Sequence, residues 1–402
     1  MTSSNTVIHK VLDGLPLTPD EGLDLYLNAE TSTLGLLADE VRRSKLQTEQ
    51  KQGIVTYIID RNINPTNVCI TDCGFCAFYR RPGDPESYIL DEEQYFQKIQ
   101  ELVDAGGTQI LVQGGHHPYL KTDWFEELFR KTKKRFPQVW IHGMSPPEID
   151  HLSKLDKIPV LEVLRRLQQA GLDSLPGGGA EILVERVRKI IAPKKATTEE
   201  WLDVMRQLAK LGMRGTATMM FGHVETPKER IEHLLRIREL QEECGVFTAF
   251  IPWTFQPDHT PQGKEWLEGK PKASAHEYLR MLAISRIFLH NIDNIQSSWV
   301  TQGIKTCQIG LAMGANDFGS AMLEENVVSS AGCDNMTSVL EIERHIKDAG
   351  FIPRRRNMLY QFLDENNHPI ESRIADLQNQ KVPIGQCIEN TKESSKETEA
   401  GQ

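Results

Sequence analysis

The feature that most restricts the fold of this chain is a regular alternation of strand-like and helix-like segments. Short runs of β-branched and apolar residues, typical of buried strands, are followed by amphipathic stretches of helical length. Repeated strand–helix units with right-handed crossovers predict a parallel sheet, and seven or eight of them predict a (β/α)8 barrel of the TIM type. We expect strands at residues 54–59, 108–112, 139–142, 172–175, 216–221, 247–255 and 295–300.

The segments between these strands carry helix start signals. Asp91 with Gln94 matches a capping box, and Thr226 stands before a proline at the first helical turn. We expect helices at residues 91–105, 122–135, 161–170, 181–191 and 274–290, others beginning near 197, 226 and 305, and a helical stretch at about 17–50.

Three parts of the chain follow from this pattern. We expect an N-terminal helical extension at residues 1–50, a barrel with a C-terminal substrate-binding portion at 51–365, and a tail at 366–402 that is disordered from about 389. A doubly wound sheet is the alternative fold, but it would have a glycine-rich fingerprint after the first strand, where this chain has cysteines.

Cys69, Cys73 and Cys76 form a C-x3-C-x2-C run with an aromatic residue, Phe75, before the last cysteine. Iron–sulfur clusters are held by cysteine thiolates, usually four, so three predict a cubane with one iron open to another ligand. Structural zinc or a redox dithiol are the alternatives, but no second pair of ligands follows nearby. The other four cysteines are scattered, which argues against a disulfide framework.

Composition excludes several classes of protein. The net charge of −10 disfavours non-specific nucleic-acid binding, and no apolar stretch is long enough to span a membrane. The first residues lack the pattern of a signal peptide, so we expect a cytoplasmic protein, where an oxygen-sensitive cluster would be protected.

Polar and glycine-rich segments follow the predicted strands, at the end of a barrel where catalytic loops lie. In chain order they are the cysteine run, residues 113–118, 145–148, 175–181, 222–225 and 256–257. This common location predicts an active site at that rim.

The cysteine run after a first barrel strand resembles the signature of the radical S-adenosylmethionine superfamily. The resemblance implies that the three cysteines bind a [4Fe–4S] cluster whose open iron chelates S-adenosyl-L-methionine. Phe75 then lies beside the adenine, and the Gly114–Gly115 backbone meets the methionine amino group. Gly222 and Glu225 resemble a later G-x-x-E segment near the adenosyl group; a tight turn before a helix is the alternative.

Later segments resemble the futalosine-pathway and deazaflavin-cofactor branch, and within it the cyclases of dehypoxanthine futalosine in menaquinone biosynthesis. They are residues 145–148, 174–181, 216–226, 247–257 and 299–303. The resemblance implies that a 5′-deoxyadenosyl radical removes hydrogen from ribose C4′ of the substrate. The carbon radical then adds to the substrate's benzoate ring, and loss of an electron and a proton leaves a spirocyclic product. It also implies an electron donor such as flavodoxin or ferredoxin.

The last proton needs a base, and we expect Glu148, on a proline-rich loop, to serve. An exposed loop acid without a role is the alternative. Ser145, Gln256 and Asn316 are candidates for hydrogen bonds to the substrate, whereas Arg280 and Arg286 are expected on a helix surface.

Two other functions stay open on the sequence. One is a sibling radical enzyme, an aminofutalosine synthase or a deazaflavin-cofactor synthase subunit, which would use the same cysteines. The other is a non-catalytic iron–sulfur or zinc protein that senses redox state.

Overall fold

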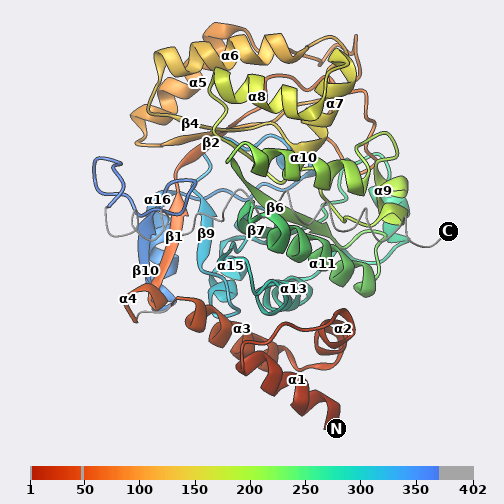
Figure 1. Ribbon diagram of the computed structural model, residues 1–402, viewed down its shortest axis with the longest axis vertical. Coiled ribbons are helices and arrows are strands. Elements are labelled where there is room, and N and C mark those ends of the chain that lie inside the picture. Colours follow the sequence, from red (N-terminus) through yellow and green to blue (C-terminus); the bar gives the residue numbers. More distant parts are fainter. Residues whose placement is uncertain (1, 47–48, 371–402) are drawn as a thin grey trace, which may run out of the picture.

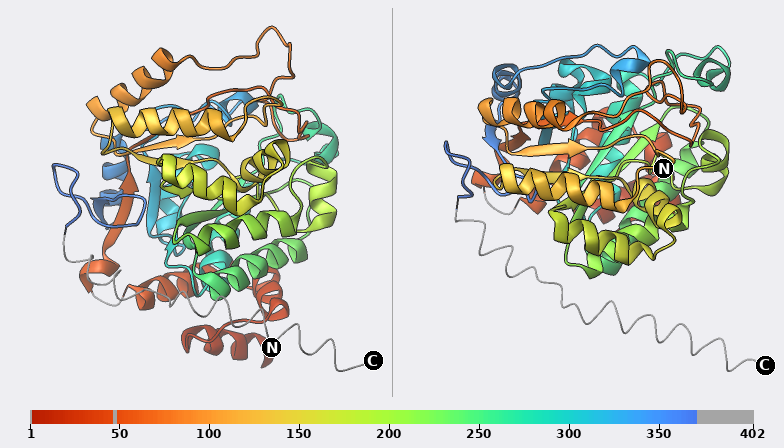
Figure 2. Two further views of the ribbon diagram at one scale, coloured as in Figure 1. Left: turned by 45° about the horizontal axis from the view of Figure 1, so that its top comes forward. Right: turned by 90° about the horizontal axis from the view of Figure 1, so that it is seen from above.

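The computed structural model describes residues 2–46 and 49–370 of the chain. A parallel sheet curls through the centre and helices cover its outer side (Figures 1 and 2), so the predicted barrel architecture is confirmed. The strands are β1 (Ile54–Ile58), β2 (Asp60–Ile63), β3 (Gln109–Val112), β4 (Trp140–Gly143), β5 (Ser174–Leu175), β6 (Arg214–Phe221), β7 (Phe247–Thr254), β8 (Asn294–Ile295), β9 (Asp317–Ser320) and β10 (Ile352–Arg355).

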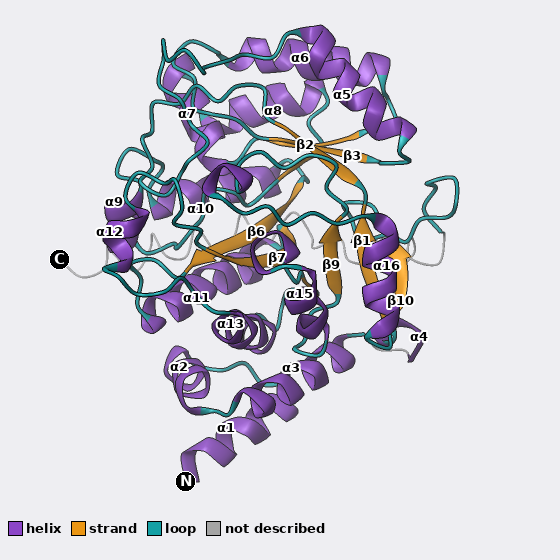
Figure 3. Cartoon of the chain, turned by 180° about the vertical axis from the view of Figure 1, so that it is seen from behind, coloured by secondary structure: helices purple, strands orange, loops and turns teal. Residues whose placement is uncertain are grey.

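The helices include an N-terminal group, those between the strands and one before β10 (Figure 3). They are α1 (Thr2–Leu12), α2 (Pro19–Asn28), α3 (Thr31–Lys45), α4 (Glu49–Gln52), α5 (Glu92–Asp104), α6 (Thr122–Arg135), α7 (Pro146–Asp156), α8 (Val160–Ala170), α9 (Glu185–Ile191), α10 (Thr198–Lys210), α11 (Pro227–Cys244), α12 (Gly263–Leu267), α13 (Ala275–Phe288), α14 (Trp299–Gln302), α15 (Ile304–Leu311), the 3-10 turn η1 (Ser329–Ala331) and α16 (Val339–Asp348). The tail predicted to be disordered from about residue 389 lies outside the described residues.

The strands follow one another around a barrel. Neighbouring strands pair in the order β2-β3-β4-β5-β6-β7-β8, all in parallel. Backbone bonds then join β8 to β9, since the Asn316 N–H donates to Ile295 O at 3.1 Å and the Ser297 N–H to Asp317 O at 2.9 Å. Strand β9 pairs with β1, which continues through a single residue into β2. The first barrel position is therefore shared by β1 and β2.

Strand β10 adds a neighbour to β1 that the sequence analysis does not predict. It pairs in parallel from Ile54 opposite Ile352 to Tyr57 opposite Arg355. The segment contains Pro353 and two arginines, which weakens the strand signal, but proline is tolerated at the edge of a sheet. The C-terminal segment is thereby fixed to the start of the barrel.

Several predicted boundaries were wrong. The strand expected at 54–59 is replaced by two strands, β1 and β2, of which the second ends at Ile63. The strand expected at 295–300 is a two-residue strand followed by helix α14. Residues 145–148, where we expected a proline-rich loop, form the N-cap and first turn of helix α7, because two prolines fit the first turn of a helix. Helix α9 begins at Glu185, four residues later than expected.

The N-terminal helices pack on the barrel helices α11 and α13, at the bottom of Figure 1. Arg280 of α13 donates to Ala29 O at 2.7 Å and to Thr31 Oγ1 at 2.9 Å, so it joins these helices to the barrel. Arg286 is fully buried and donates to Gly314 O at 2.7 Å. The expectation of a position on the helix surface was therefore wrong for Arg286, whereas Arg280 is half-buried.

The core lies between the sheet and the inner faces of the helices. Leu164 and Leu167 of α8, Trp201 of α10 and Phe288 of α13 are completely buried there. Each such side chain contributes roughly 1.5–3 kcal/mol relative to an exposed one. Among the described helices, none is long and apolar enough to cross a membrane.

Candidate active site at the carboxyl end of the barrel

The three cysteines of the C-x3-C-x2-C run lie in the loop that follows β2. Cys69 and Cys73 are buried and Cys76 is half-buried, and all three are free thiols. Burial raises the pKa of the Cys73 thiol to about 12, so in the absence of a cation this thiol stays protonated. Such a buried set of thiols would ionise on binding a cationic centre.

Neighbouring loops fix the backbone of this cysteine loop. The Ile70 N–H donates to His116 O at 3.2 Å, and the Gly74 N–H donates to Ile191 O at 2.9 Å. The Cys69 N–H also donates to Arg80 O at 2.9 Å. The loop therefore has a defined shape that rests on the segments after β3 and before α10.

The loop after β3 approaches the cysteines through two glycines. The Gly115 N–H donates to Thr66 O at 2.9 Å. A β-carbon on Gly115 would lie 2.2 Å from Val68 O and 3.0 Å from Cys69 Cβ, so only glycine fits there. The Gly114 N–H donates to Glu148 Oε1 at 3.0 Å.

Glu148 lies in the first turn of helix α7, not in a loop. Its second oxygen accepts from the Ser145 N–H at 2.7 Å and from the Ser145 hydroxyl at 2.6 Å, which forms a buried capping box. Burial raises the pKa of Glu148 to about 7, although these hydrogen bonds lower it. Both carboxylate oxygens have protein partners, and neither Glu148 nor Ser145 lines the cavity described below.

Gly222 and Glu225 form the turn between β6 and α11. The Glu225 carboxylate accepts from the Gly222 N–H at 2.6 Å and the His223 N–H at 3.0 Å, and it pairs with Arg230 at 2.8 Å. Although burial acts in the opposite direction, His223 and Arg230 hold the pKa of Glu225 well below its usual range. The carboxylate is therefore charged and keeps the turn closed.

Glu181 and Lys195, which the sequence analysis does not select, lie next to the cysteine loop. Glu181 is buried, has a left-handed φ of 42°, and accepts from Lys195 Nζ at 2.8 Å. The same ammonium lies 5.3 Å from the centre of the Phe75 ring. Although burial opposes the charge of Lys195, the Glu181 carboxylate raises the pKa of this ammonium. A buried ion pair with a strained carboxylate residue often marks a functional site.

A small apolar pocket of about 50 Å³ adjoins the last cysteine. Gln256 is part of its wall, but its side chain already donates to Thr254 and accepts from Lys272 Nζ at 3.1 Å. The pocket is lined by Phe75, Cys76, Ala77, Met220, Trp253, Phe255, Gln256, Val327, Val328 and Ala331. Cys76 therefore has a mostly apolar pocket on one side.

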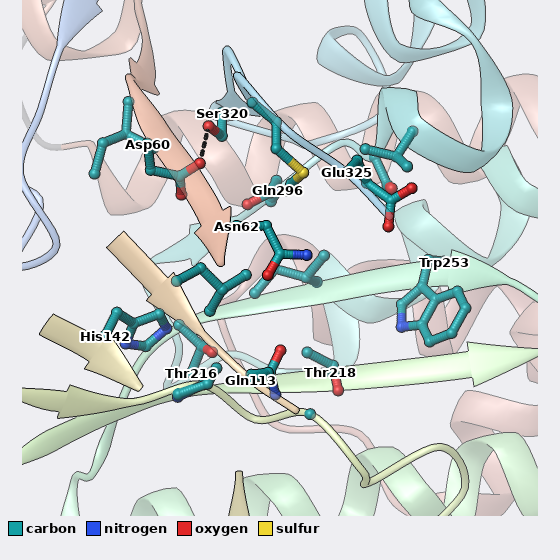
Figure 4. Close-up of a pocket in the computed structure, with 18 of the residues that line it drawn as sticks. Asp60, Asn62, Gln113, His142, Thr216, Thr218, Trp253, Gln296, Ser320 and Glu325 are labelled. Atoms are coloured by element: carbon teal, nitrogen blue, oxygen red, sulfur yellow. Dashed lines mark hydrogen bonds between the residues drawn. The ribbon is translucent and has the colours of Figure 1, made fainter. Parts of the chain in front are cut away.

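A larger cavity of about 300 Å³ occupies the barrel interior and shares Trp253, Val327 and Val328 with the small pocket. Figure 4 shows Trp253 and Glu325 at one end of this cavity and Asp60 with His142 at the other. Its apolar wall includes Leu111 and Ile251. The cavity therefore connects the cysteine-loop end of the barrel with a polar interior.

We call the polar end of this cavity the floor, formed by Asp60, Gln109, His142, Ser320 and Arg356. Asp60 accepts from the Ser320 hydroxyl at 2.5 Å and from Gln109 Nε2 at 3.2 Å. Burial raises the pKa of Asp60 to about 6, although Ser320, Arg356 and Gln109 act against the shift. The carboxylate is therefore ionised at neutral pH and keeps unused acceptor positions.

The Arg356 guanidinium is neutralised from below by Asp317, with contacts of 2.5 and 2.9 Å. Burial, with a smaller contribution from Arg356, lowers the pKa of His142 to about 3, so this imidazole is neutral. Asn316 lies before β9, at the opposite end of the strand from the rim, and its Oδ1 accepts from Arg286 at 2.7 Å. Asn316, a candidate for a hydrogen bond to the substrate, therefore lies away from the rim.

Sequence reasoning did not identify the floor residues, although a signal for them exists. Strands buried on both faces in a parallel sheet usually read as continuous apolar runs. Asp60, Gln109 and His142 interrupt such runs, and all three are buried. A polar residue within a predicted buried strand is therefore a signal for a side chain that points into the barrel or forms an internal hydrogen bond.

The residues around the cysteine loop fit a cubane cluster. Three free thiols come from one anchored loop, an apolar pocket adjoins Cys76, and the glycine at 115 lets the loop after β3 pass close to Cys69. Within residues 2–46 and 49–370, no three His, Cys, Asp or Glu side chains converge on one metal ion. A cubane does not need such convergence, because its cysteines bind different iron atoms.

Comparisons with known proteins agree with this geometry. A family model described as the radical SAM superfamily matches residues 63–237, and one described as the CofH/MqnC C-terminal region matches residues 244–369. The chain is 45% identical to cyclic dehypoxanthine futalosine synthase of Streptomyces coelicolor, over 92% of each protein. It is 44% identical to the enzyme of that name from Halalkalibacterium halodurans, over 90% of this chain and 95% of the relative.

A relative with a different name is nearly as similar. The 5-amino-6-(D-ribitylamino)uracil–L-tyrosine 4-hydroxyphenyl transferase 1 of Methanosarcina barkeri is 42% identical, over 87% of this chain and 91% of the relative. The solved structure of methylornithine synthase matches with a TM-score of 0.67 at 19% identity, over 87% of this chain and 97% of that protein. That likeness shows the fold.

Enzymes of this superfamily use a [4Fe–4S] cluster and S-adenosylmethionine, and the cysteine loop matches that requirement in residue type and place. Identity of more than two residues in five over most of the chain extends the relationship beyond the cluster-binding part. The chain therefore belongs to the radical S-adenosylmethionine superfamily, as an enzyme of the branch with a CofH/MqnC-type C-terminal region.

Proposed function

We propose that this enzyme converts dehypoxanthine futalosine into its cyclic product in menaquinone biosynthesis. The observation that carries the proposal is the 45% identity with a cyclic dehypoxanthine futalosine synthase over 92% of both chains. When bound, the cluster and S-adenosylmethionine supply a 5′-deoxyadenosyl radical that can take a hydrogen atom from the ribose of the substrate.

The chain's own residues bind, orient and enclose the reactants in this proposal. Cys69, Cys73 and Cys76 hold the cluster, and Phe75 with its apolar pocket accommodates the adenine. The Gly114–Gly115 backbone would meet the methionine amino group, with its position fixed by the hydrogen bond from Gly114 to Glu148. Water exclusion by the pocket walls protects a radical from quenching.

Glu181 and Lys195 extend this cofactor site. A buried ammonium favours a carboxylate, and a buried carboxylate favours hydroxyl or ammonium groups, so the pair suits the zwitterionic and sugar parts of S-adenosylmethionine. Gly222 and Glu225 keep the turn after β6 closed over the same side of the barrel. We assign Glu148 a positioning role, because both of its oxygens already have backbone or hydroxyl partners.

The barrel cavity takes the substrate. Its apolar wall suits the benzoate ring, and Trp253 stands where the cavity meets the small pocket. Electrons come from a reduced flavodoxin or ferredoxin, in a reducing cytoplasm where the cluster survives.

The second candidate is the transferase reaction, because a methanogen relative of that name is 42% identical over 87% of the chain. The anaerobically reconstituted enzyme should be given reductant, S-adenosylmethionine and either dehypoxanthine futalosine or 5-amino-6-ribitylaminouracil with tyrosine. Mass spectrometry should show a product two hydrogens lighter than dehypoxanthine futalosine, in step with 5′-deoxyadenosine. Product only from the uracil and tyrosine pair would replace the cyclase by the transferase. A Cys73→Ala variant should give neither product.

A further inference from the structure

The floor of the barrel cavity contains a buried acceptor with no partner. Gln109 Oε1 has no hydrogen bond within the described part of the chain, although its side chain lines the cavity and is only 4% exposed. Leaving a buried carbonyl oxygen unpaired costs roughly 1–3 kcal/mol. A group that donates a hydrogen bond at this place would remove that cost, so the site indicates a ligand with a donor.

The acceptors around this oxygen belong to one hydrogen-bonded row across three strands. The Ser320 hydroxyl of β9 donates to Asp60 Oδ1 of β2, and Gln109 Nε2 of β3 donates to Asp60 Oδ2. Asp60 and Gln109 are direct partners in the β2–β3 register. The dashed line in Figure 4 marks the contact between Ser320 and Asp60. Both Asp60 oxygens still have a free lone pair, so the row presents several acceptors to the cavity.

We propose that this floor binds the hydroxyl groups of the substrate's sugar, and that the benzoate carboxylate points toward Trp253 and the rim. The assignment rests on the proposed function for the identity of the substrate. A sugar hydroxyl can donate to Gln109 Oε1 or to Asp60. A carboxylate has no hydrogen to donate, and it would face the negative charge of Asp60, while the Arg356 guanidinium is already paired with Asp317. At the Trp253 end, the Glu325 carboxylate already accepts from three backbone N–H groups.

A donor on the other side of the floor completes the recognition of a hydroxyl, which both donates and accepts. His142 Nδ1 lies 2.7 Å from Ser174 Oγ, and this oxygen accepts from the Trp140 indole N–H at 2.7 Å. In the tautomer of His142 that carries its proton on Nε2, the Ser174 hydroxyl donates to Nδ1. In that tautomer the Nε2–H can donate to a sugar oxygen.

The same arrangement fits the reaction. In this orientation the sugar and the benzoate ring share the one cavity that meets the small pocket beside Cys76. The benzoate ring then lies beside the apolar wall near Trp253, on the way to the small pocket. Substrate orientation would therefore be set by hydroxyl recognition at the floor.

The test measures the dissociation constants of three kinds of ligand for the reconstituted holoenzyme, in the absence of reductant. They are intact dehypoxanthine futalosine, analogues lacking one ring hydroxyl of the sugar, and an analogue whose carboxylate is a carboxamide. The wild-type enzyme should bind at least one deoxy analogue about 10–100-fold more weakly than the intact substrate. In the Gln109→Leu or Asp60→Asn variant, the difference in affinity between the intact and deoxy ligands should fall to within about 3-fold. The variant lacks the protein group that binds the hydroxyl, so removal of the hydroxyl then costs little.

The carboxamide arm fixes the orientation. The ratio of the dissociation constants of the carboxamide analogue and the intact substrate should be the same in the wild type and in both floor variants. Gln100→Leu, on the exposed face of α5, is the control and should change neither this ratio nor that of the deoxy analogues. Two results would overturn the assignment and leave the cyclase proposal standing. In one, the floor variants bind the carboxamide analogue as tightly as the intact substrate. In the other, the wild type binds the intact and deoxy ligands equally well. Absence of binding by the intact substrate would overturn both. Because Asp60→Asn preserves side-chain shape, it provides the test if Gln109→Leu does not fold.

Discussion

Single buried residues in the barrel have ionisation properties that set how stability depends on pH. Asp60 has a pKa of about 6 in the folded protein, raised by burial, against 3.8 for an ordinary aspartate. A carboxyl with a raised pKa stabilises the folded state most when it is protonated. Its contribution is therefore complete below about pH 4 and is lost as the pH rises to about 6.

We predict that Asp60→Asn removes this part of the pH dependence. The difference between 3.8 and about 6 corresponds to about 3 kcal/mol, so the variant should gain about that much stability relative to the wild type between pH 4 and pH 7. Urea unfolding of both proteins at four pH values measures this gain. The raised pKa of Glu148 contributes equally to both proteins and cancels in the comparison. A difference that stays constant with pH would contradict the prediction.

At the scale of elements, helix α7 positions the loop that approaches the cysteines. Its capping box places Glu148 against Ser145, and the remaining oxygen holds the Gly114 N–H. The first turn of one helix therefore sets the backbone next to Cys69. A change in this turn should act on the cofactor site and not on the substrate cavity.

We predict that Glu148→Gln weakens S-adenosylmethionine binding about 10-fold. The amide NH2 of glutamine replaces one carboxylate oxygen, so a backbone N–H that Glu148 binds loses its acceptor, and the Gly114–Gly115 backbone is held less well. Cofactor binding to the reconstituted enzyme, measured by equilibrium dialysis, provides the readout. Glu341→Gln is the matched control, since Glu341 occupies the same capping-box position with Ser338 in helix α16. Normal cofactor affinity with slow turnover would instead favour Glu148 as a base.

Elements with strong local signals could be predicted, and those fixed by distant contacts could not. The capping boxes at Asp91 and Thr226 begin helices where the sequence indicates. Strand β10 depends on pairing with β1, about 300 residues earlier in the chain, and no local pattern reveals such pairing. Helix α7 was missed because two prolines suggest a loop unless they fall in the first helical turn.

At the scale of the whole molecule, an ion pair joins the C-terminal segment to the barrel. Arg356, directly after β10, makes a two-point contact with the fully buried Asp317 at the start of β9. Asp317 also accepts from Thr56 of β1 at 2.6 Å, and the Tyr360 ring lies 3.9 Å from the guanidinium. Strands β1 and β9 and the segment after β10 therefore meet at one carboxylate.

Arg356→Leu should destabilise the protein by about 3–5 kcal/mol, because it leaves the Asp317 charge buried without its partner. The double variant Arg356→Leu with Asp317→Asn should recover part of this loss, since a neutral amide costs less to bury. Urea unfolding of the wild type and both variants measures the difference. A double variant less stable than the single one would show that the ion pair does not limit stability.

The candidate site could be predicted in part for the same physical reason. The cysteines and Gly114–Gly115 were recognisable because the chemistry and the close approach restrict residue type. The roles of Ser145 and Asn316 depend on which way their side chains turn, and both face protein partners instead of the cavity. Glu181 and Lys195 become neighbours only through the folded chain.

The shared first barrel position also has a consequence for the order of events during synthesis. The cysteine loop follows β2, whereas the strands that flank β1 end only at Ser320 and Arg355. At roughly 5–20 residues per second, a ribosome needs about 15–60 seconds to make the chain between Cys76 and Arg355. During that interval the nascent cysteines cannot yet be enclosed by the finished barrel, which leaves time for iron and sulfide delivery before the polypeptide closes around them.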